Sequence, residues 1–317
     1  MHGRSCARPF LPAAILAPKR DMHTASGFNG AMDHVLPSAQ HPFQVVLPSQ
    51  QTSPVVFASP HSGSNYPADF LESARLDAIG LRRSEDSFVD ELFAGAPGTG
   101  APLLKATFPR AYCDPNREPW ELDPTMFEDD LPPWVNTTSA RVGAGLGTLA
   151  RVVANGETIY RDKLPFREAE FRVQSCWKPY HDMLAALIAE TRTRFGACLL
   201  IDCHSMPAHA SRGAPPDIVL GDAHGTACAG GITRLVETTL SGMGYEVRRN
   251  DPYAGGYVTR HYGRPREGVH ALQIEIARGL YMDEALFVRR PGFDTLQRRL
   301  TTLAASLAAG APDLLLP

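Results

Sequence analysis

Three short runs of almost wholly apolar residues most restrict what this chain can fold into. They are PVVFASP at 54–60, ACLLIDCHS at 197–205 and HALQIEIA at 270–277. Such runs are typical of strands that are buried on both faces of a parallel sheet. A parallel sheet of this kind needs helices on both faces. The runs therefore predict an α/β protein with a buried central sheet.

The rest of the chain alternates strand-like and helix-like segments from Phe43 onward, as an α/β layer fold requires. Further strands are predicted at 44–48 and 217–222 and at the start of YEVRRNDPYAGGYVTRHYG, 245–263, with a bent strand or strand pair at 102–114. Helices are predicted at 71–81, 85–96, 168–195, 226–242 and 293–309, and a loop at 131–156. We expect a three-layer α/β fold with a mixed, mostly parallel central sheet and helices on both faces.

The chain has no internal repeat and no clear linker, so residues 43–317 are predicted to form one domain. Residues 1–42 match a secretory signal poorly and are interpreted as a disordered extension or as the result of a start codon assigned too early. No apolar run reaches the roughly 18 residues of a membrane span. The six cysteines form no CxxC pair, which favours free thiols in a reducing cytoplasm.

The charge of the chain restricts its partners. The formal net charge is -3, and the sequence has no basic stripe of the kind that follows a phosphate backbone. We therefore expect a small-molecule substrate, no nucleic acid and no membrane as partners. The oligomeric state does not follow from the sequence.

Two of the buried runs bring a histidine to a strand end. His61 follows the run at 54–60, and His204 lies near the end of the run at 197–205. Open α/β sheets place their ligands at the carboxyl ends of their strands, so the two imidazoles could converge on one metal. A catalytic zinc site has three protein ligands and an open position for water. Hydrogen-bonded core or loop histidines are the alternative.

A carboxylate should complete this metal site. Asp86 is the first candidate and Glu85 the second, because both begin the helix predicted at 85–96 and could face the strand end. A favourable charge at a helix N-terminus is the alternative explanation for Asp86. Asp202 points to the same side of its strand as His204, where it could orient that ligand or contact the metal.

Glu275 is a single carboxylate within the third buried run, where an unpaired charge would be costly. Strand alternation places Glu275 on the face of Gln273 and Ala277, and Ile274 on the other face. A polar strand edge would explain it without catalysis. Beside a metal, it would be suited to accept the proton of an attacking water.

Two polar segments supply candidates for substrate binding. Arg117 lies in DPNRE and Arg260 in GGYVTRHYG, both of which look like turn-rich loops. A guanidinium is well suited to bind a carboxylate, although solvated surface arginines are the alternative. Asn116 and Tyr262, from the same two segments, are further candidates for substrate contacts.

Taken together, these segments resemble the N-formylglutamate amidohydrolase family. The likeness runs from Pro54 to Glu284, through SPHSGSNYP, EDSFVDELF, PRAYCDPNREP, IDCHSMP, DIVLGDAHGTAC, NDPYAGGYVTRHYGRP and GVHALQIEIARGLYMDE. The resemblance implies a hydrolase fold related to zinc carboxypeptidases and aspartoacylase-like deacylases, with one Zn²⁺ per chain. It also implies roles for individual residues: metal ligands His61, Asp86 and His204, general base Glu275, and carboxylate-binding Arg117 and Arg260. No carboxylate follows His61 by three residues, so the HxxE pattern of the carboxypeptidases is missing.

The implied reaction is the hydrolysis of N-formyl-L-glutamate to formate and L-glutamate, as the last step of a histidine-degradation pathway. Ala277 stands where the family pattern has asparagine, which leaves open a related deacylase that acts on another N-acyl amino acid or a small peptide-like amide. A protein that keeps the fold and binds a small molecule without a metal is the alternative from another class.

Overall fold

The computed structural model describes residues 41–208 and 216–315, which belong to one compact unit, Ala39–Pro317. Within these residues the main sheet has seven strands in the order β1-β3-β2-β4-β7-β5-β6. Their bounds are β1 Phe43–Val46, β2 Val55–Ser59, β3 Leu103–Ala106, β4 Cys198–Met206, β5 Ile218–Gly221, β6 Val247–Arg249 and β7 Val269–Ala277. A separate hairpin pairs β8, Met282–Asp283, with β9, Val288–Arg289.

The centre of the sheet is parallel and its margins are not. Strands β3, β2, β4 and β7 run in one direction, whereas β1 pairs antiparallel with β3 and β5 pairs antiparallel with β7. Every residue of β2, β4 and β7 is buried. The three apolar runs therefore form the buried centre of the sheet, and the mixed, mostly parallel arrangement is confirmed.

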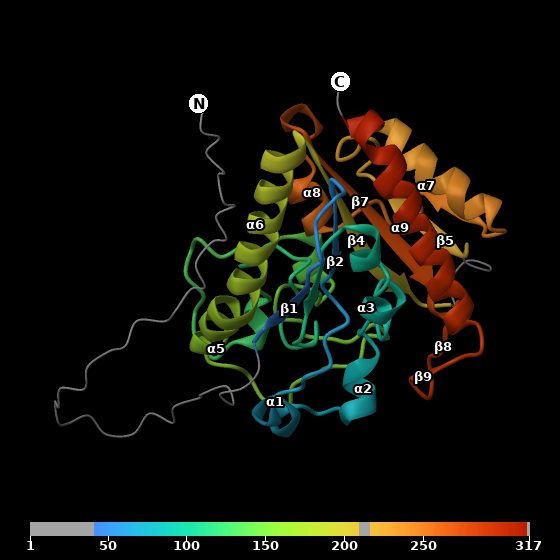
Figure 1. The fold of residues 1–317 in the computed structure, drawn as a ribbon. Coiled ribbons are helices and arrows are strands. Elements are labelled where there is room, and N and C mark those ends of the chain that lie inside the picture. The colour runs from blue at the N-terminus through green and yellow to red at the C-terminus, as the bar shows by residue number, and fades with distance from the viewer. Residues whose placement is uncertain (1–40, 209–215, 316–317) are drawn as a thin grey trace, which may run out of the picture. The chain divides into compact units, whose positions relative to one another are not determined.

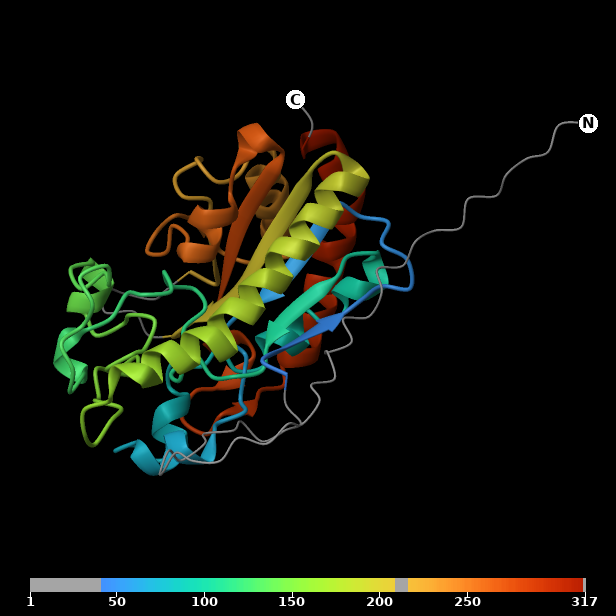
Figure 2. The same ribbon diagram turned by 90° about the vertical axis from the view of Figure 1, so that its left-hand side faces the viewer.

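Helices cover both faces of this sheet (Figures 1 and 2). Their bounds are α1 Ala68–Ser73, α2 Ala78–Arg82, α3 Val89–Leu92, α4 Ala140–Gly143, α5 Phe166–Arg172, α6 Lys178–Phe195, α7 Gly230–Gly242, α8 Tyr257–Tyr262 and α9 Phe293–Leu315. Core residues of α3, α7 and α9 pack with one set of strand side chains, and those of α6 and α8 pack with the other. The three-layer architecture is confirmed.

The side chains of β7 alternate between the hydrophobic core and a cavity. Leu272, Ile274 and Ile276 belong to the core beneath α7 and α9. Gln273 and Glu275 alternate with them and line a cavity instead. The period-two prediction for this strand is therefore confirmed, and it places a carboxylate at the ligand-binding end of the sheet.

Several element boundaries differ from the prediction. The helix expected at 85–96 is only the single turn α3, because Phe88 has a left-handed backbone with φ 67° that prevents the helix from extending back toward Asp86. In the segment 102–114 only β3 is a strand, and the residues after it form turns. The helix expected at 168–195 is α5 and α6 joined by the π-helical turn Val173–Trp177.

Further boundaries differ in the second half of the chain. The helix expected from residue 226 begins at Gly230 as α7, and the terminal helix α9 continues past residue 309 to Leu315. The segment GGYVTRHYG, expected as a loop, contains α8. Short 3-10 turns also occur at Ala96–Thr99, Pro124–Met126, Pro265–Glu267 and Arg278–Leu280.

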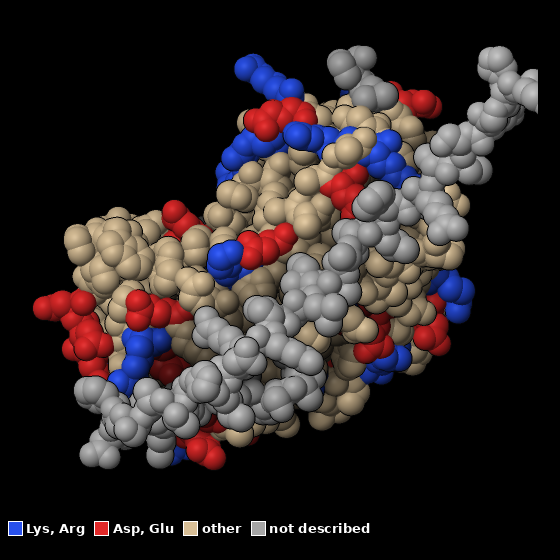
Figure 3. Space-filling model, turned by 60° about the vertical axis from the view of Figure 1, so that its left-hand side comes forward, with Lys and Arg blue, Asp and Glu red and all other residues tan. Residues whose placement is uncertain are grey.

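Other predictions concern the surface and the termini. Cys113, Cys176, Cys198, Cys203 and Cys228 are buried free thiols, and Cys6 lies outside the described residues. The proposed extension at 1–42 lies almost entirely outside them as well. No helix in the described ranges is long and apolar enough to cross a membrane. The face in Figure 3 carries basic and acidic side chains interspersed with other residues.

Candidate metal centre

His61, Asp86 and His204 meet at the carboxyl end of the parallel strands. One ligand atom from each lies within 4.8 Å of the other two, and all three residues are buried. His61 lies in the loop after β2, and His204 lies within β4, two residues before its end. Asp86 is fixed beside them because its backbone N–H donates to the His61 carbonyl at 3.0 Å. The sheet thus brings together three residues from distant parts of the sequence.

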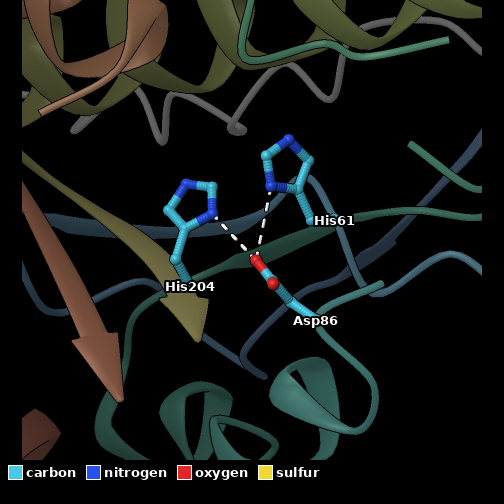
Figure 4. A group of neighbouring side chains, drawn as sticks. All are labelled: His61, Asp86 and His204. Carbon is cyan, nitrogen blue, oxygen red and sulfur yellow. Dashed lines mark hydrogen bonds and ion pairs between the residues drawn. The ribbon is translucent and has the colours of Figure 1, made fainter. Parts of the chain in front are cut away.

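Both imidazoles point the same ring nitrogen at one carboxylate oxygen (Figure 4). The Asp86 Oδ2 atom lies 3.3 Å from His61 Nδ1 and 3.1 Å from His204 Nδ1. Burial alone would raise the pKa of Asp86, but the facing rings of His204 and His61, together with the charge of Arg278, hold that pKa well below its usual range. Asp86 is therefore a carboxylate, and its negative charge faces the two rings.

The other nitrogen of each ring also faces a carboxylate. His61 Nε2 is hydrogen-bonded to Asp114 Oδ1 at 2.7 Å, and His204 Nε2 lies 3.0 Å from Asp202 Oδ1. The position of Asp202 agrees with the prediction that it lies on the His204 side of the strand. Carboxylates in this outer position orient a metal-binding histidine and strengthen its ligating nitrogen.

The donor set fits a divalent cation. His61 Nδ1 is buried and has no hydrogen-bond partner among the described residues, although a buried ring nitrogen normally has one. Both oxygens of the fully buried Asp202 are also without a hydrogen bond there. A bound cation would give His61 Nδ1 a partner and offset these clustered negative charges. Two imidazoles and one carboxylate match a catalytic zinc site.

Arg278 holds the second oxygen of Asp86. Its guanidinium lies 3.1 Å from Asp86 Oδ1 and also donates to Ser205 Oγ at 3.2 Å. This arrangement leaves Asp86 Oδ2 to face the two histidines. In contrast, Glu85 is bonded to Tyr66, Arg82 and Ser87, so its carboxylate faces away from the group. Asp86, and not Glu85, is therefore the acidic member of this site.

Glu275 lies next to the histidine of the neighbouring strand. In the β4–β7 register its partner is His204, and Gln273 Nε2 donates to its Oε1 atom at 2.7 Å. Gln273 Oε1 in turn accepts the Gly256 backbone N–H at 2.7 Å. Burial raises the pKa of Glu275 to about 7, with the charge of His204 opposing and that of Asp86 adding to the shift. A carboxyl with this pKa can exchange a proton near neutral pH.

A cavity of about 240 Å³ opens over these residues. Its polar lining includes His61 and residues of α4, β4, β7, the turn after β7 and the loops at 84–86, 110–117 and 253–256. Four arginines line it, namely Arg110, Arg117, Arg141 and Arg278. The cavity thus combines a cluster of carboxylates and imidazoles with several guanidinium groups.

Two of the four predicted substrate contacts lie in this cavity. Arg117 is buried, and its guanidinium donates to the Leu146 carbonyl at 2.8 Å and to the Asn116 carbonyl at 2.7 Å. The Asn116 side chain accepts from the Val258 N–H at 2.8 Å and contacts His204 Nε2 at 3.1 Å. Asn116 therefore supports His204 and the α8 backbone.

The other two predicted contacts lie elsewhere. Arg260 is exposed on α8, donates to the Gly255 carbonyl at 3.2 Å and lines a different surface pocket. The Tyr262 hydroxyl is hydrogen-bonded to His181 Nδ1 at 2.9 Å and is not part of the cavity wall. The expectation of a turn-rich loop was wrong here, because the short helix α8 turns both side chains away from the cavity.

The sequence reasoning missed several residues of the site, among them Arg110, Asp114 and Arg278. Arg110 and Asp114 lie in PRAYCDPNREP, the segment from which only Asn116 and Arg117 were selected. Arg278 follows directly after the buried strand β7. A charge at the end of a buried strand was the signal used for His204, and the same signal could have found Arg278.

Two imidazoles and a carboxylate thus converge at the ends of parallel strands of an α/β fold, beside a buried glutamate, and this arrangement is compatible with a metal-binding hydrolase. The residue pattern described as N-formylglutamate amidohydrolase matches residues 53–282 of this chain. The chain therefore belongs to the N-formylglutamate amidohydrolase family.

Individual relatives agree with this membership. The N-formylglutamate deformylase of Pseudomonas aeruginosa is 30% identical over 238 residues, which cover 73% of this chain and 83% of the relative. That of Pseudomonas putida is 29% identical over 237 residues, or 73% and 82% of the two chains. The crystal structure of N-formylglutamate amidohydrolase from Ralstonia eutropha JMP134 superposes with a TM-score of 0.81 at 40% identity, covering 85% of this chain and 98% of that one.

Proposed function

We propose that this protein hydrolyses the amide of an N-formyl acidic amino acid, with N-formyl-L-glutamate as substrate and formate and L-glutamate as products. The observation that carries the proposal is the buried convergence of His61, Asp86 and His204 beside Glu275 in a chain of this family. The histidine-degradation role that the resemblance implies belongs to the same proposal.

In this proposal His61 Nδ1, Asp86 Oδ2 and His204 Nδ1 hold one Zn²⁺. Bound zinc would supply a Lewis acid for the amide oxygen and would lower the pKa of a water molecule. The protein contributes the orientation of the ligands, since Asp114, Asp202 and Arg278 face the sides of these residues that do not ligate.

Glu275 is the proposed general base. It would accept a proton from the attacking water and return it to the nitrogen of the leaving glutamate. Gln273 holds Oε1 of Glu275, and Oε2 has no hydrogen bond within residues 41–208 and 216–315. One oxygen is therefore fixed while the other is available for the proton.

Arg117 is the proposed partner of a substrate carboxylate, because it is buried in the cavity wall beside Asn116. Its Nε and Nη1 atoms are held by backbone carbonyls, so the plane of the guanidinium is fixed. A preorganised guanidinium binds a carboxylate with little loss of entropy. Arg260 is not part of this proposal, because it lines another pocket.

The test is formate release from N-formyl-L-glutamate by the zinc-loaded protein, compared with N-acetyl- and N-succinyl-L-glutamate. We expect the formyl compound to be preferred. Faster cleavage of the other acyl groups would indicate a related deacylase. A protein that purifies with less than about half an equivalent of metal, and whose His61→Ala variant still binds L-glutamate, would instead be a binding protein without metal chemistry.

A further inference from the structure

The four arginines that line the cavity differ in whether an acidic side chain of the protein balances their positive charge. Arg278 is paired with Asp86 at 3.1 Å, and Arg110 with Asp114 at 2.7 Å. Arg117 lies 3.9 Å from Asp114, the same carboxylate that Arg110 uses. The Arg141 guanidinium has neither a hydrogen bond nor an ion pair within the described ranges 41–208 and 216–315. Arg110 and Arg117 thus share Asp114, which is itself bonded to His61, and Arg141 has no acidic partner in these ranges.

Arg141 is held at a defined place beside Arg117. The Leu146 carbonyl accepts from Arg117 Nε at 2.8 Å, and the Leu146 N–H donates to the Arg141 carbonyl at 2.8 Å. Arg141 also lies in α4, where Ser139 Oγ accepts from the Val142 N–H and Val142 is buried. The exposed Arg141 side chain therefore starts from an anchored backbone and reaches the cavity wall.

The two guanidinium groups are close enough to repel each other. Burial lowers the pKa of Arg117, Asp114 and, more weakly, Glu121 oppose this shift, and the positive charges of Arg110 and Arg141 lower that pKa further. Like charges that face a cavity without an acidic partner between them favour the binding of an anion there. The same cavity is also lined by the carboxylates Asp86 and Glu275, and Asp86 is paired with Arg278.

We infer that Arg141, next to Arg117, binds the side-chain carboxylate of the substrate and thereby sets the preference for an acidic over a neutral amino acid. This inference rests on the proposed function and adds to it a specificity-determining residue. The lining of the cavity supports it, because Arg141 faces the cavity beside Arg117 and has no acidic partner within residues 41–208 and 216–315. Arg141 would act on substrate binding and not on the reacting atoms.

The test compares N-formyl-L-glutamate with N-formyl-L-glutamine, which has nearly the same shape but no side-chain charge. For the wild-type protein we expect kcat/KM to be at least 10-fold higher with the acidic substrate. Arg141→Ala should lower kcat/KM for the acidic substrate by about 10- to 100-fold, the equivalent of one charged hydrogen-bonded contact, mainly through KM. For the neutral substrate the change should stay within about threefold. Arg141→Lys should restore part of the preference, because it keeps the charge but not the planar fork.

Arg151→Ala is the matched control. Arg151 lies in the same segment but is paired with Asp123 at 2.7 Å and does not line the cavity, so its variant should keep the wild-type ratio of the two substrates. Calorimetry with the zinc-loaded protein should show that Arg141→Ala weakens the binding of L-glutamate and not that of L-glutamine. Equal losses for both substrates, or a wild-type protein with no preference, would overturn the inference while leaving the proposed function intact. If neither substrate releases formate, the proposed function itself fails.

Discussion

At the residue scale, Glu275 shows how a single carboxylate can be held ready for proton transfer. It lies in a strand whose every residue is buried, and its contacts to Gln273 and its place beside His204 come from the sheet itself. Glu275 does not belong to the group of possible metal ligands formed by His61, Asp86 and His204. Its removal should therefore separate metal binding from turnover.

We predict that Glu275→Gln keeps a full equivalent of metal and loses about 10²- to 10⁴-fold in kcat, the usual contribution of a general base. Metal analysis and formate release measure the two properties. Glu246→Gln, at an exposed glutamate paired with Arg248, should behave like the wild type. A Glu275→Gln variant that retained most of its kcat would assign the proton transfer to another group.

His181 gives a second residue-scale prediction. It is buried, its Nε2 atom is hydrogen-bonded to the Pro115 carbonyl at 2.8 Å, and its ring stacks on Trp177. Burial lowers the pKa of His181 to about 4, although the hydrogen bond to Pro115 opposes the shift. Above pH 6.5 the ring is neutral in both the folded and unfolded states, so it contributes no pH dependence. As the pH falls below 6.5, only the unfolded chain gains the proton, and stability decreases until about pH 4.

The protonation of His181 in the unfolded chain should therefore lower the free energy of unfolding by about 2 kcal/mol when the pH falls from 7 to 5. We expect His181→Gln to lose this part of the pH dependence, whereas a variant of the exposed His41, His41→Gln, should keep it. Urea unfolding of metal-free protein at the two pH values measures the difference. Identical pH dependence in the wild type and His181→Gln would show that this ring is protonated in the folded state.

At the element scale, the site depends on the loop after β2 passing very close to the residues after β3. A Cβ atom added at Gly63 would lie 2.0 Å from the Phe108 carbonyl oxygen, which is a backbone atom that cannot easily move. The same loop carries His61. Any displacement there should therefore move His61, a proposed metal ligand, as well as strain the fold.

Gly63→Ala should lower the free energy of unfolding by about 1–3 kcal/mol, the usual cost of forced overpacking, and should weaken metal binding. Gly98→Ala is the matched control, because an added Cβ meets nothing within 4 Å there. Denaturant unfolding and zinc titration measure the two effects. If Gly63→Ala bound zinc as tightly as Gly98→Ala, the His61 loop would have to be more adaptable than this packing implies.

At the scale of the whole molecule, a bound metal would link segments that are far apart in the sequence. His61, Asp86 and His204 come from two loops and a central strand, and several buried carboxylates surround them. A ligand that binds only the folded state stabilises it, by about 4 kcal/mol at 1,000 times its Kd. The metal site should therefore be a substantial part of the stability.

We predict that chelation lowers Tm and abolishes formate release, and that one equivalent of zinc restores both. His61→Ala should show no comparable rise in Tm on addition of zinc, which provides the control. A chelated wild-type protein with unchanged Tm and activity would exclude this site as a functional metal centre.

The sequence alone determined the architecture and much of the site. Buried apolar runs predict buried strands because hydrophobic periodicity is a local property, and the charged or imidazole side chains within or just after those runs stand out for the same reason. His61, His204 and Glu275 were found in this way, and the strand alternation around Glu275 is confirmed.

Only the tertiary structure decided which side chains share the cavity. Arg260 and Arg141 are both exposed arginines in irregular parts of the sequence, yet only Arg141 reaches the cavity, because the direction of α8 and the anchoring of α4 depend on long-range packing. The choice of Asp86 over Glu85 likewise depends on a backbone hydrogen bond to His61 and on the pairing with Arg278. Contacts between residues so distant in the sequence leave no local pattern, because they are fixed only when the layers of the fold pack together.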